Sequence, residues 1–374
     1  MTSATTAKGL EGVVVATTNV SHVFGEEGRL VYRGYEIGEL AGKASFEEVC
    51  HLLWKGHLPN RTELDELNQL LRARRNLPEA GMAALRALPR TGGPMDALRT
   101  AASAVGAALP IDGKPTFEQA ATLTACFPTI VAAFHRLRGG REPIAPRADL
   151  GHAANYLYMI SGEVPQAHHI KSLDTYLVLL ADHAMNASTF TARVIASTES
   201  DLASCVVGAI GALKGPLHGG APALVMDMLD AIGSADNIKP WIDHTLNSGG
   251  KLMGFGHRVY RTTDPRAEIL REMARHASTP EFFALAKGTE DYAIQELNRR
   301  KPERRLYTNV EFYSAAVLNS VGLPRDLYPP TFAVSRIAGW TAHVLEQLIG
   351  NRLIRPQSEY TGPQGLRFVP IENR

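Results

Sequence analysis

The sequence predicts a mainly α-helical protein with a minor β element near the N-terminus. Two observations predict this class. Residues 11–37 alternate apolar and polar side chains around a glycine-bounded turn, as short strands do. After them, helix-capping residues and apolar residues at helical spacing dominate. With 374 residues, 45% of them hydrophobic, the chain can bury a sizeable core in one large domain or in two to three.

The first elements follow directly from local signals. Residues 11–37 are predicted to form short strands or a small hairpin. Ser45 and Glu48 then form a capping box ahead of an apolar run, and Gly56 ends that helix.

The middle and the end of the chain are predicted to be helical. Thr116 with Gln119 caps one helix, and Pro128 is expected in the first turn of another. The segment 172–198 is Ala- and Leu-rich and nearly free of Gly and Pro, so it is expected to form one long helix that contains His183. Further helices are expected at 203–213, 222–232, 265–277, 281–297, 309–321 and 331–350.

Two Gly- and Pro-rich breaks suggest a domain organisation. They lie near 214–221 and 322–330, and they could bound a smaller helical domain inserted into a larger one. The alternative is that they separate helices of a single domain, where such breaks also occur.

Composition limits the classes of function. The chain has 39 Lys and Arg against 38 Asp and Glu, a balance that argues against a general nucleic-acid binder. The three cysteines are scattered without a CxxC pattern, which fits a reduced compartment and neither a disulfide scaffold nor a zinc site. No signal peptide and no apolar run near the roughly 18 residues of a membrane span is found. We therefore expect a cytoplasmic protein.

Two glycine-flanked histidines, His218 and His257, are the main chemical signal. Glycines allow the backbone to approach a ligand closely. His218 precedes an expected helix, whose positive end disfavours a protonated imidazole, so a neutral ring could donate an N–H to a carbonyl or enolate oxygen. The alternative is a loop histidine that bonds only to the backbone.

Arginines gather after the second histidine. His257 follows a Gly-Phe-Gly sequence, and Arg258, Arg261 and Arg266 lie within ten residues of it. Such loops can hold phosphates through backbone N–H groups and guanidinium forks. The alternative is an exposed basic turn. Helix capping explains the Asp264-Pro265 pair but leaves Arg266 unexplained.

Four other residues could contribute charge or a base. Arg336 lies among apolar helix residues and needs a partner, which is either a protein carboxylate or a substrate carboxylate. Arg355 needs such a partner too, although fewer apolar residues surround it in the sequence. His183 alone would usually be structural. Glu311 is flanked by apolar residues, and burial would raise its pKa and make it a general base, unless it is simply an exposed helix glutamate. Together these residue types suit carbon–carbon bond formation through an enolate on an anionic substrate.

Several strings taken in order resemble the citrate synthase family, in its shorter bacterial type. The likeness runs from about residue 8 to about residue 362. The matching strings are KGLEGV at 8–13, GRLVYRGY at 28–35, DH at 182–183, NAST at 186–189, KGPLHGGA at 214–221, GFGHRVY at 254–260, TDPR at 263–266, NV at 309–310, FYS at 312–314 and FAVSRIAGW at 332–340.

The resemblance implies a mostly helical homodimer with an active-site cleft between two domains. The large domain would comprise 1–220 plus 326–374, and the small domain 221–325 would close over the cleft. By position, His218 resembles the histidine that stabilises the enol of acetyl-CoA. His257 resembles the one that polarises and then protonates the oxaloacetate ketone.

The resemblance also implies the remaining contacts. His183, Arg266 and Arg336 match oxaloacetate-binding positions, and Arg355 matches an arginine that reaches into the neighbouring subunit's site. No cofactor and no metal is implied, since acetyl-CoA and oxaloacetate are substrates. The expected coenzyme A contacts are Lys251, Leu252, Met253, Gly254, Phe255, Gly256, Arg258 and Arg305.

One position departs from the family pattern. The family base is an aspartate, and here it is Glu311, which moves the carboxylate by about one methylene; a misplacement of about 1 Å can cost about 100-fold in rate. The favoured interpretation is a citrate synthase of the Si type that has adjusted to Glu311. The alternatives are a 2-methylcitrate synthase that uses propionyl-CoA, and a non-catalytic or weakly active ligand-binding paralogue.

Overall fold

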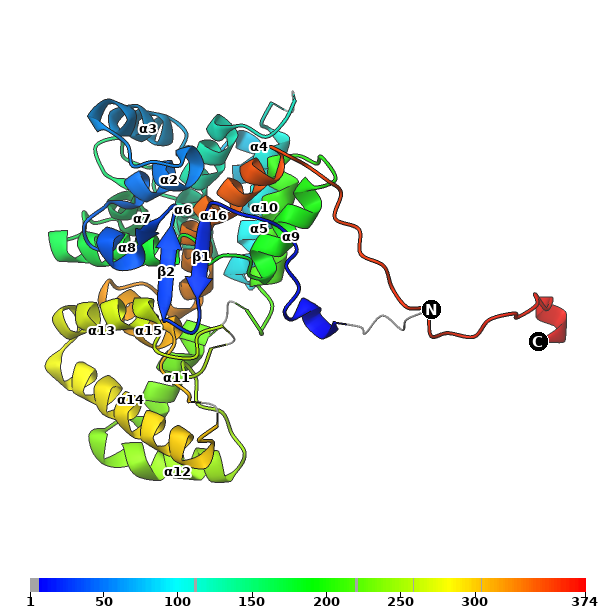
Figure 1. The fold of residues 1–374 in the computed structure, drawn as a ribbon. Coiled ribbons are helices and arrows are strands. Elements are labelled where there is room, and N and C mark those ends of the chain that lie inside the picture. The colour runs from blue at the N-terminus through cyan, green and yellow to red at the C-terminus, as the bar shows by residue number, and fades with distance from the viewer. Residues whose placement is uncertain (1–6, 111–112, 219–220, 258, 304) are drawn as a thin grey trace.

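The computed structural model describes residues 7–110, 113–218, 221–257, 259–303 and 305–374. Helices make up most of this part of the chain, with one small sheet near the N-terminus (Figure 1). This confirms the predicted class. Short 3-10 turns lie at Lys8–Leu10, Ala235–Asn237, Arg325–Leu327 and Ile371–Asn373.

The sheet is antiparallel, with strands β1 (Ser21–Phe24), β2 (Arg29–Tyr32) and β3 (Tyr35–Glu36) in that order. It contains the predicted hairpin and a short third strand. The Tyr32 hydroxyl donates to the carbonyl of Asp182 at 2.8 Å and accepts from the Asp182 N–H at 3.0 Å. The sheet therefore anchors the backbone next to His183.

The larger group of helices surrounds α16 (Tyr328–Gln347), which packs against α2, α5, α6, α8, α9 and α10. Most residues of α16 are buried, because neighbours surround it on nearly all sides. The other helices of this group are α1 (Ile37–Leu40), α2 (Phe46–Lys55), α3 (Arg61–Ala73), α4 (Glu79–Ala87), α5 (Pro94–Ala107), α6 (Phe117–Arg138), α7 (His152–Ser161), α8 (Ala167–Leu180), α9 (Ala187–Ala196) and α10 (Leu202–Leu213).

The second group lies at the opposite end of the molecule from α3 and α4 (Figure 1). It consists of α11 (Ala221–Ile232), α12 (Ile238–Asn247), α13 (Pro265–Ala277), α14 (Pro280–Arg300) and α15 (Val310–Ser320). Helices α13 and α15 pack against each other, and both also contact α8 of the larger group. The division into domains at 220/221 and 325/326 stays a prediction.

The expected long helix over 172–198 is wrong. Helix α8 ends at Leu180 and α9 begins at Ala187, so His183 lies in a non-helical connection. Ala184 adopts a left-handed φ of 50°, and the Asn186 side chain caps α9 by accepting the N–H of Thr189. The break depends on side-chain bonds rather than on Gly or Pro, so composition does not reveal it.

The expected first-turn position of Pro128 is also wrong. The helix capped by Thr116 and Gln119 continues through Pro128 as a single α6. Proline removes one backbone hydrogen bond from a helix interior, and burial among α3, α4, α5, α7 and α16 keeps this helix intact. By length and composition α6 could cross a membrane, but 83% of its apolar window is buried inside the protein, as in a core helix.

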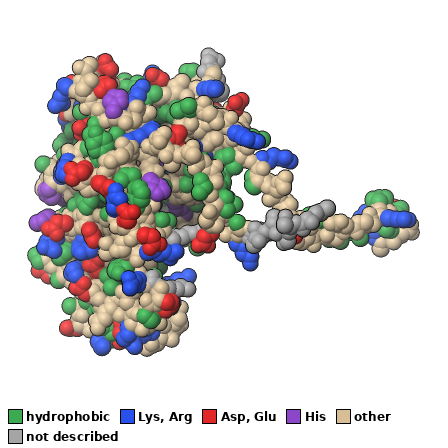
Figure 2. Space-filling model, viewed as in Figure 1, with side chains coloured by type: hydrophobic (Ala, Val, Ile, Leu, Met, Phe, Trp, Pro, Cys, Tyr) green, Lys and Arg blue, Asp and Glu red, His purple; other side chains and the backbone are tan. Residues whose placement is uncertain are grey.

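The chain after α16 leaves the helical body. Figure 1 shows this segment extending away from the other elements. It carries exposed apolar side chains, among them Leu366 and Phe368, of which 80% and 83% of the surface is exposed. On the face drawn in Figure 2, the described basic and acidic side chains are interspersed, in keeping with the balanced charge of the sequence.

Candidate active site

Six of the predicted site residues lie around one partly buried centre where the two helix groups meet. Rings of His183 and His257 are 5.4 Å apart, although 74 positions separate them in the sequence. Burial lowers the pKa of both histidines, and the positive charge of Arg266 lowers it further. The same charge opposes the raised pKa of Glu311. The six residues are His183 before α9, His218 before α11, His257 before α13, Arg266 in α13, Glu311 in α15 and Arg336 in α16.

His257 is held as a neutral imidazole of one tautomer. Its Nδ1 accepts the backbone N–H groups of Val259 at 3.0 Å and Tyr260 at 3.1 Å, so that nitrogen carries a lone pair. Burial, and then the charge of Arg266, lowers the pKa of His257 to about 4. At pH 7 the single ring proton is therefore on Nε2, which is available to donate to a ligand.

His218 is held as the opposite tautomer. Its Nε2 accepts the backbone N–H of Ser188 at 3.3 Å and lies 2.7 Å from the Ser188 hydroxyl. Burial, and then Arg336, lowers its pKa to about 4. The ring proton is therefore on Nδ1. The Ser188 hydroxyl in turn accepts the indole N–H of Trp340 at 3.0 Å.

His183 contacts the second histidine through a tyrosine. Its Nε2 lies 3.3 Å from the hydroxyl of Tyr260, and the Tyr260 ring stacks beside His257 at 4.7 Å. Burial, followed by the charges of Arg266 and neighbouring groups, lowers the pKa of His183 well below its usual value. This centre thus contains three neutral histidines at pH 7.

Glu311 has a buried carboxylate oxygen without a hydrogen-bond partner in the described part of the chain. Its Oε2 is fully buried and contacts no donor among the described residues. Burial raises the pKa of Glu311 to about 7, against the opposing charge of Arg266. Glu311 is therefore buried, and its pKa is raised, as one of the two interpretations from the sequence required.

The two arginines of the centre differ in their partners. Arg266 makes a bidentate pair with Asp264, with Nε–Oδ1 and Nη2–Oδ2 distances of 3.0 and 2.8 Å. Asp264 also caps α13, so it has more than the capping role expected from the sequence. Arg336 donates from Nε to the Leu180 carbonyl at 2.8 Å and lies over the Phe332 ring.

Arg336 makes no ion pair with a carboxylate among the described residues. Its side chain is only 1% exposed, and burial lowers its pKa to about 10. An almost fully buried guanidinium is costly without a counter-charge. Asp182 supplies part of that counter-charge from beyond ion-pair distance. The terminal nitrogens of the fork make no hydrogen bond to a described residue, so they remain available for an anion.

Backbone pairing fixes the distance between His257 and Glu311. Gly256 donates its N–H to Tyr307 at 2.8 Å, and Asn309 donates its N–H to the Gly254 carbonyl at 2.9 Å. The Asn309 side chain caps α15 at the N–H of Glu311 and donates to the Gly256 carbonyl. Gly254 must be glycine, because its φ is +84° and a Cβ would lie 2.8 Å from that of Phe312.

A cavity of about 870 Å³ opens beside His257. It is large enough for a substantial organic ligand. Its lining includes basic and acidic groups as well as aromatic rings: Glu11, Glu26, His257, Tyr260, Arg261, Thr262, Asp264, Glu303, Arg305, Leu306, Tyr307 and Thr308.

Comparison with known proteins shows the family. The family model "Citrate synthase, C-terminal domain" matches residues 9–357. Citrate synthase 2 of Bacillus subtilis is 45% identical, over 99% of this chain and 100% of the relative. 2-Methylcitrate synthase 2 of Corynebacterium glutamicum is 39% identical over 100% of both.

The chain belongs to the citrate synthase family.

A solved citrate synthase agrees in fold as well. The Thermoplasma acidophilum enzyme, in ternary complex with carboxymethyl coenzyme A and oxaloacetate, superposes with a TM-score of 0.91. It is 32% identical, and the match covers 98% of this chain and 99% of that one. Like other members of the family, this protein is a transferase that carries out a condensation.

Other site residues predicted from the family pattern lie outside this centre or outside the described chain. Arg355 is exposed on the segment after α16. Of the expected coenzyme A contacts, Arg305 lines the cavity, whereas Lys251, Leu252, Met253, Gly254, Phe255 and Gly256 are not among its lining residues. Arg258 lies outside the described residues.

Three residues that support this centre were not singled out from the sequence. Ser188 and Trp340 form the hydrogen-bonded chain to His218, and Tyr260 connects His183 to His257. All three lie inside strings that carry the family likeness. Their position in those strings was the available signal, but their residue types alone do not indicate such contacts.

Proposed function

We propose that this protein is a citrate synthase that condenses acetyl-CoA with oxaloacetate and water to give citrate and coenzyme A. The observation that carries the proposal is the Glu311 carboxylate, whose buried oxygen is unpartnered and whose pKa is raised to about 7. A general base is most effective when its pKa is near the working pH. Neutral histidines with fixed tautomers lie around it.

In the first step, Glu311 removes a proton from the methyl carbon of acetyl-CoA. Negative charge then moves onto the thioester oxygen. His218 donates its Nδ1–H to that oxygen, because its Nε2 already accepts from Ser188. Preorganised donors of this kind stabilise an enolate most effectively in a site that excludes water.

In the second step, the nucleophilic carbon forms a bond to the ketone carbon of oxaloacetate. His257 donates its Nε2–H to the ketone oxygen and transfers that proton as the alkoxide forms. His183 adds a contact to oxaloacetate, and Arg266 and Arg336 hold its carboxylates, which suits the unpaired fork of Arg336. Water then hydrolyses the citryl-CoA thioester, and the proton that Glu311 took up returns to His257, which restores both groups.

Arg355 is proposed to complete the site of a second subunit in a homodimer. Its exposure on a segment that extends from the body supports this role. The coenzyme would contact the 251–256 segment, Arg258 and Arg305. No redox change occurs, so we expect no nicotinamide or metal to take part in the reaction, and we expect a cytoplasmic location.

The second candidate is 2-methylcitrate synthase, favoured by the relative of that name in Corynebacterium glutamicum. The two substrates differ by one methylene, which alters binding in an apolar pocket by only about 1–3 kcal/mol. Measuring kcat/KM with acetyl-CoA and propionyl-CoA decides between them. A clear preference for propionyl-CoA would replace the first choice.

Release of free coenzyme A thiol tests the role of Glu311. We expect activity in the wild type and a loss of about 100- to 10,000-fold in Glu311→Gln, which cannot accept the proton. Glu311→Asp has the family's base but a shorter reach, and we expect intermediate activity. A wild type that is inactive with both acyl-CoAs, while Glu311→Asp is active, would instead indicate a ligand-binding paralogue.

A further inference from the structure

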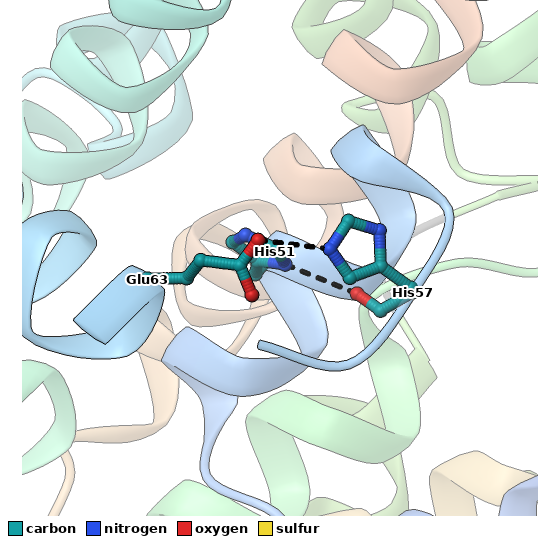
Figure 3. A group of neighbouring side chains, drawn as sticks. All are labelled: His51, His57 and Glu63. Carbon is teal, nitrogen blue, oxygen red and sulfur yellow. Dashed lines mark hydrogen bonds and ion pairs between the residues drawn. The ribbon is translucent and has the colours of Figure 1, made fainter. Parts of the chain in front are cut away.

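A separate cluster of metal-ligand side chains lies at the corner between α2 and α3. His51 comes from the second half of α2, His57 from the connection, and Glu63 from the first turn of α3 (Figure 3). Their ligand atoms all lie within 4.8 Å of one another. In the described part of the chain, no other three His, Cys, Asp or Glu side chains come together in this way.

His51 is oriented as metal-binding histidines are. Its Nδ1 lies 3.0 Å from the carbonyl oxygen of His57, and a carbonyl can only accept, so Nδ1 carries the proton. The Nε2 atom therefore has a free lone pair. A histidine that binds a metal usually donates its other ring N–H to such an acceptor. The His51 side chain is also fixed in place, because the residue is 4% exposed.

Glu63 is fixed by a different interaction. Its Oε2 accepts the N–H of Asn60 at 2.8 Å as part of the capping box of α3. Its Oε1 is directed to Nε2 of His57, at 3.1 Å. No Lys or Arg forms an ion pair with this carboxylate among the described residues. One oxygen is thus committed to the cap, and the other can take a ligand position.

The donor set and spacing fit a transition metal. Ligand atoms 3.1 Å apart, each about 2.0–2.1 Å from an ion, subtend an angle of roughly 100°, which is close to tetrahedral. Two imidazole nitrogens and one carboxylate oxygen suit Zn²⁺, whereas Ca²⁺ and Mg²⁺ prefer oxygen ligands alone. Separations of up to 4.8 Å exceed the roughly 3.4 Å between tetrahedral ligands of Zn²⁺, so side chains must shift when the ion binds. The side chains of His57 and Glu63 are 58% and 34% exposed and have the freedom to do so.

We propose that His51, His57 and Glu63 bind one Zn²⁺ ion, with water as the remaining ligand. On binding, the proton that His57 shares with Glu63 leaves Nε2, either for Nδ1 of the same neutral ring or, from an imidazolium, for water, and the ion takes the place of that hydrogen bond. The ion joins α2, which packs against α8 and α16, to α3, which packs against α6. It stabilises this corner of the fold and takes no part in the condensation.

The plainer interpretation is an exposed ion pair between His57 and Glu63. It accounts for two of the residues, but not for the orientation of His51 towards the same point. Glu63→Gln separates the two interpretations, because glutamine also completes a capping box while it lacks the charge that binds a cation. The variant should therefore fold as well as the wild type in the presence of EDTA.

Calorimetric titration of the EDTA-treated, dialysed full-length protein with Zn²⁺ provides the test. We expect the wild type to bind one equivalent of Zn²⁺. The affinity should fall by more than about tenfold in Glu63→Gln and in His57→Ala, since even the loss of a residue that only hydrogen-bonds to a metal ligand costs about 10–100-fold. The Tm should rise with Zn²⁺ more in the wild type than in either variant.

His168→Ala is the matched control, because His168 is another exposed histidine, with its ring centroid 4.1 Å from that of His169. It should behave as the wild type does. The active-site histidines His183, His218 and His257 are the same in all four proteins, so any Zn²⁺ that they bind cancels in the comparison. Equal stoichiometry and equal Tm shifts in the wild type, Glu63→Gln and His57→Ala would overturn the proposal and leave an ordinary ion pair.

Discussion

Burial acts in opposite directions on the pKa of the carboxyl group and on the pKa values of the imidazoles of the site. It raises the pKa of Glu311 to about 7 and lowers the pKa of His218 and His257 to about 4. At pH 7 the histidines are neutral donors, and Glu311 is ionised in a large fraction of molecules. The sequence attributed a neutral His218 to a helix terminus, whereas burial and Arg336 are the causes in the structure.

The raised pKa of Glu311 predicts an effect on stability. The native state keeps this proton up to about pH 7 while the unfolded chain loses it near pH 4.5, so unfolding becomes easier as the pH rises between these values. We expect Glu311→Gln to stabilise the ligand-free protein relative to the wild type by on the order of 2 kcal/mol at pH 8, and much less at pH 5.

Urea denaturation at the two pH values measures this difference. Contributions from the histidines are the same in both proteins and cancel. Glu303→Gln, which changes another glutamate of the cavity lining, serves as the control and should show no such dependence. An equal stability difference at pH 5 and pH 8 would contradict a raised pKa for Glu311.

Trp340 is predicted to position His218 through Ser188. Trp340→Phe removes the indole N–H donated to the Ser188 hydroxyl, and we expect kcat to fall roughly tenfold, equivalent to about 1.4 kcal/mol. The KM for oxaloacetate should change little, because His218 acts on the acyl-CoA. Steady-state kinetics on both substrates checks this division.

A second buried tryptophan provides the control. The indole N–H of Trp54 also bonds to α16, at the Ala338 carbonyl and the Thr341 hydroxyl, but it has no connection to His218. Trp54→Phe should therefore lower stability without lowering kcat. Equal losses of kcat in both variants would show that the effect of Trp340 is only structural.

At the scale of elements, local signals predicted the helices better than the breaks between them. Capping residues such as Ser45 and Thr116 act within one turn, so the sequence reveals them, and both capping boxes are confirmed. The break around His183 depends instead on contacts with Tyr32 in the distant sheet. Continuation of α6 through Pro128 likewise depends on tertiary packing that local propensity does not contain.

The start of α15 allows a test of how an element places its side chains. Asn309 caps Glu311 through Oδ1 and holds the 254–256 segment through Nδ2, which donates to the Gly256 carbonyl at 3.0 Å. Asn309→Asp keeps the cap but loses that donor, so we expect a lower kcat/KM with nearly unchanged Tm. Asn309→Ala should also lose about 1 kcal/mol of stability.

The same exchange at another cap controls for the change of charge. Asn60 caps α3 through its Oδ1, outside the active site. Asn60→Asp should leave kcat/KM unchanged. Wild-type activity in Asn309→Asp would mean that the bond to Gly256 is not needed to hold the two segments in register.

At the scale of the whole molecule, the convergence of the six site residues could not be predicted from their spacing. Five segments spread from His183 to Arg336 meet there, and only tertiary packing determines which segments meet. The family likeness indicated the set of residues. The effect of burial on the pKa of a carboxyl group indicated when Glu311 could act as a base. Neither indicated the tautomers, which depend on backbone groups such as the N–H of Ser188.

Buried neutral histidines predict a loss of global stability in acid. Burial lowers the pKa of His152 to about 3, so between about pH 6.5 and pH 3 only the unfolded chain binds this proton, and stability falls as the pH falls. His218 and His257 act in the same direction. We expect His152→Gln to reduce the stability lost between pH 7 and pH 5.5 by about 1 kcal/mol.

Denaturant unfolding at these two pH values measures the change. His168→Gln, at an exposed position, is the comparison and should lose as much stability as the wild type. If His152→Gln lost as much as well, the ring would already be protonated in the native protein, or the burial of its Nε2 would be incomplete.

The pairing of residues 254–256 with 307–309 bears on how such an enzyme can diversify. Apart from the bond from the Asn309 side chain, its hydrogen bonds join main-chain atoms. Most exchanges of Phe255, Tyr307 or Thr308 therefore leave the separation of His257 and Glu311 unchanged. Tyr307 and Thr308 also line the cavity beside His257. Mutation can therefore change the shape of the pocket for a longer or shorter acyl chain while the distance between His257 and Glu311 stays the same.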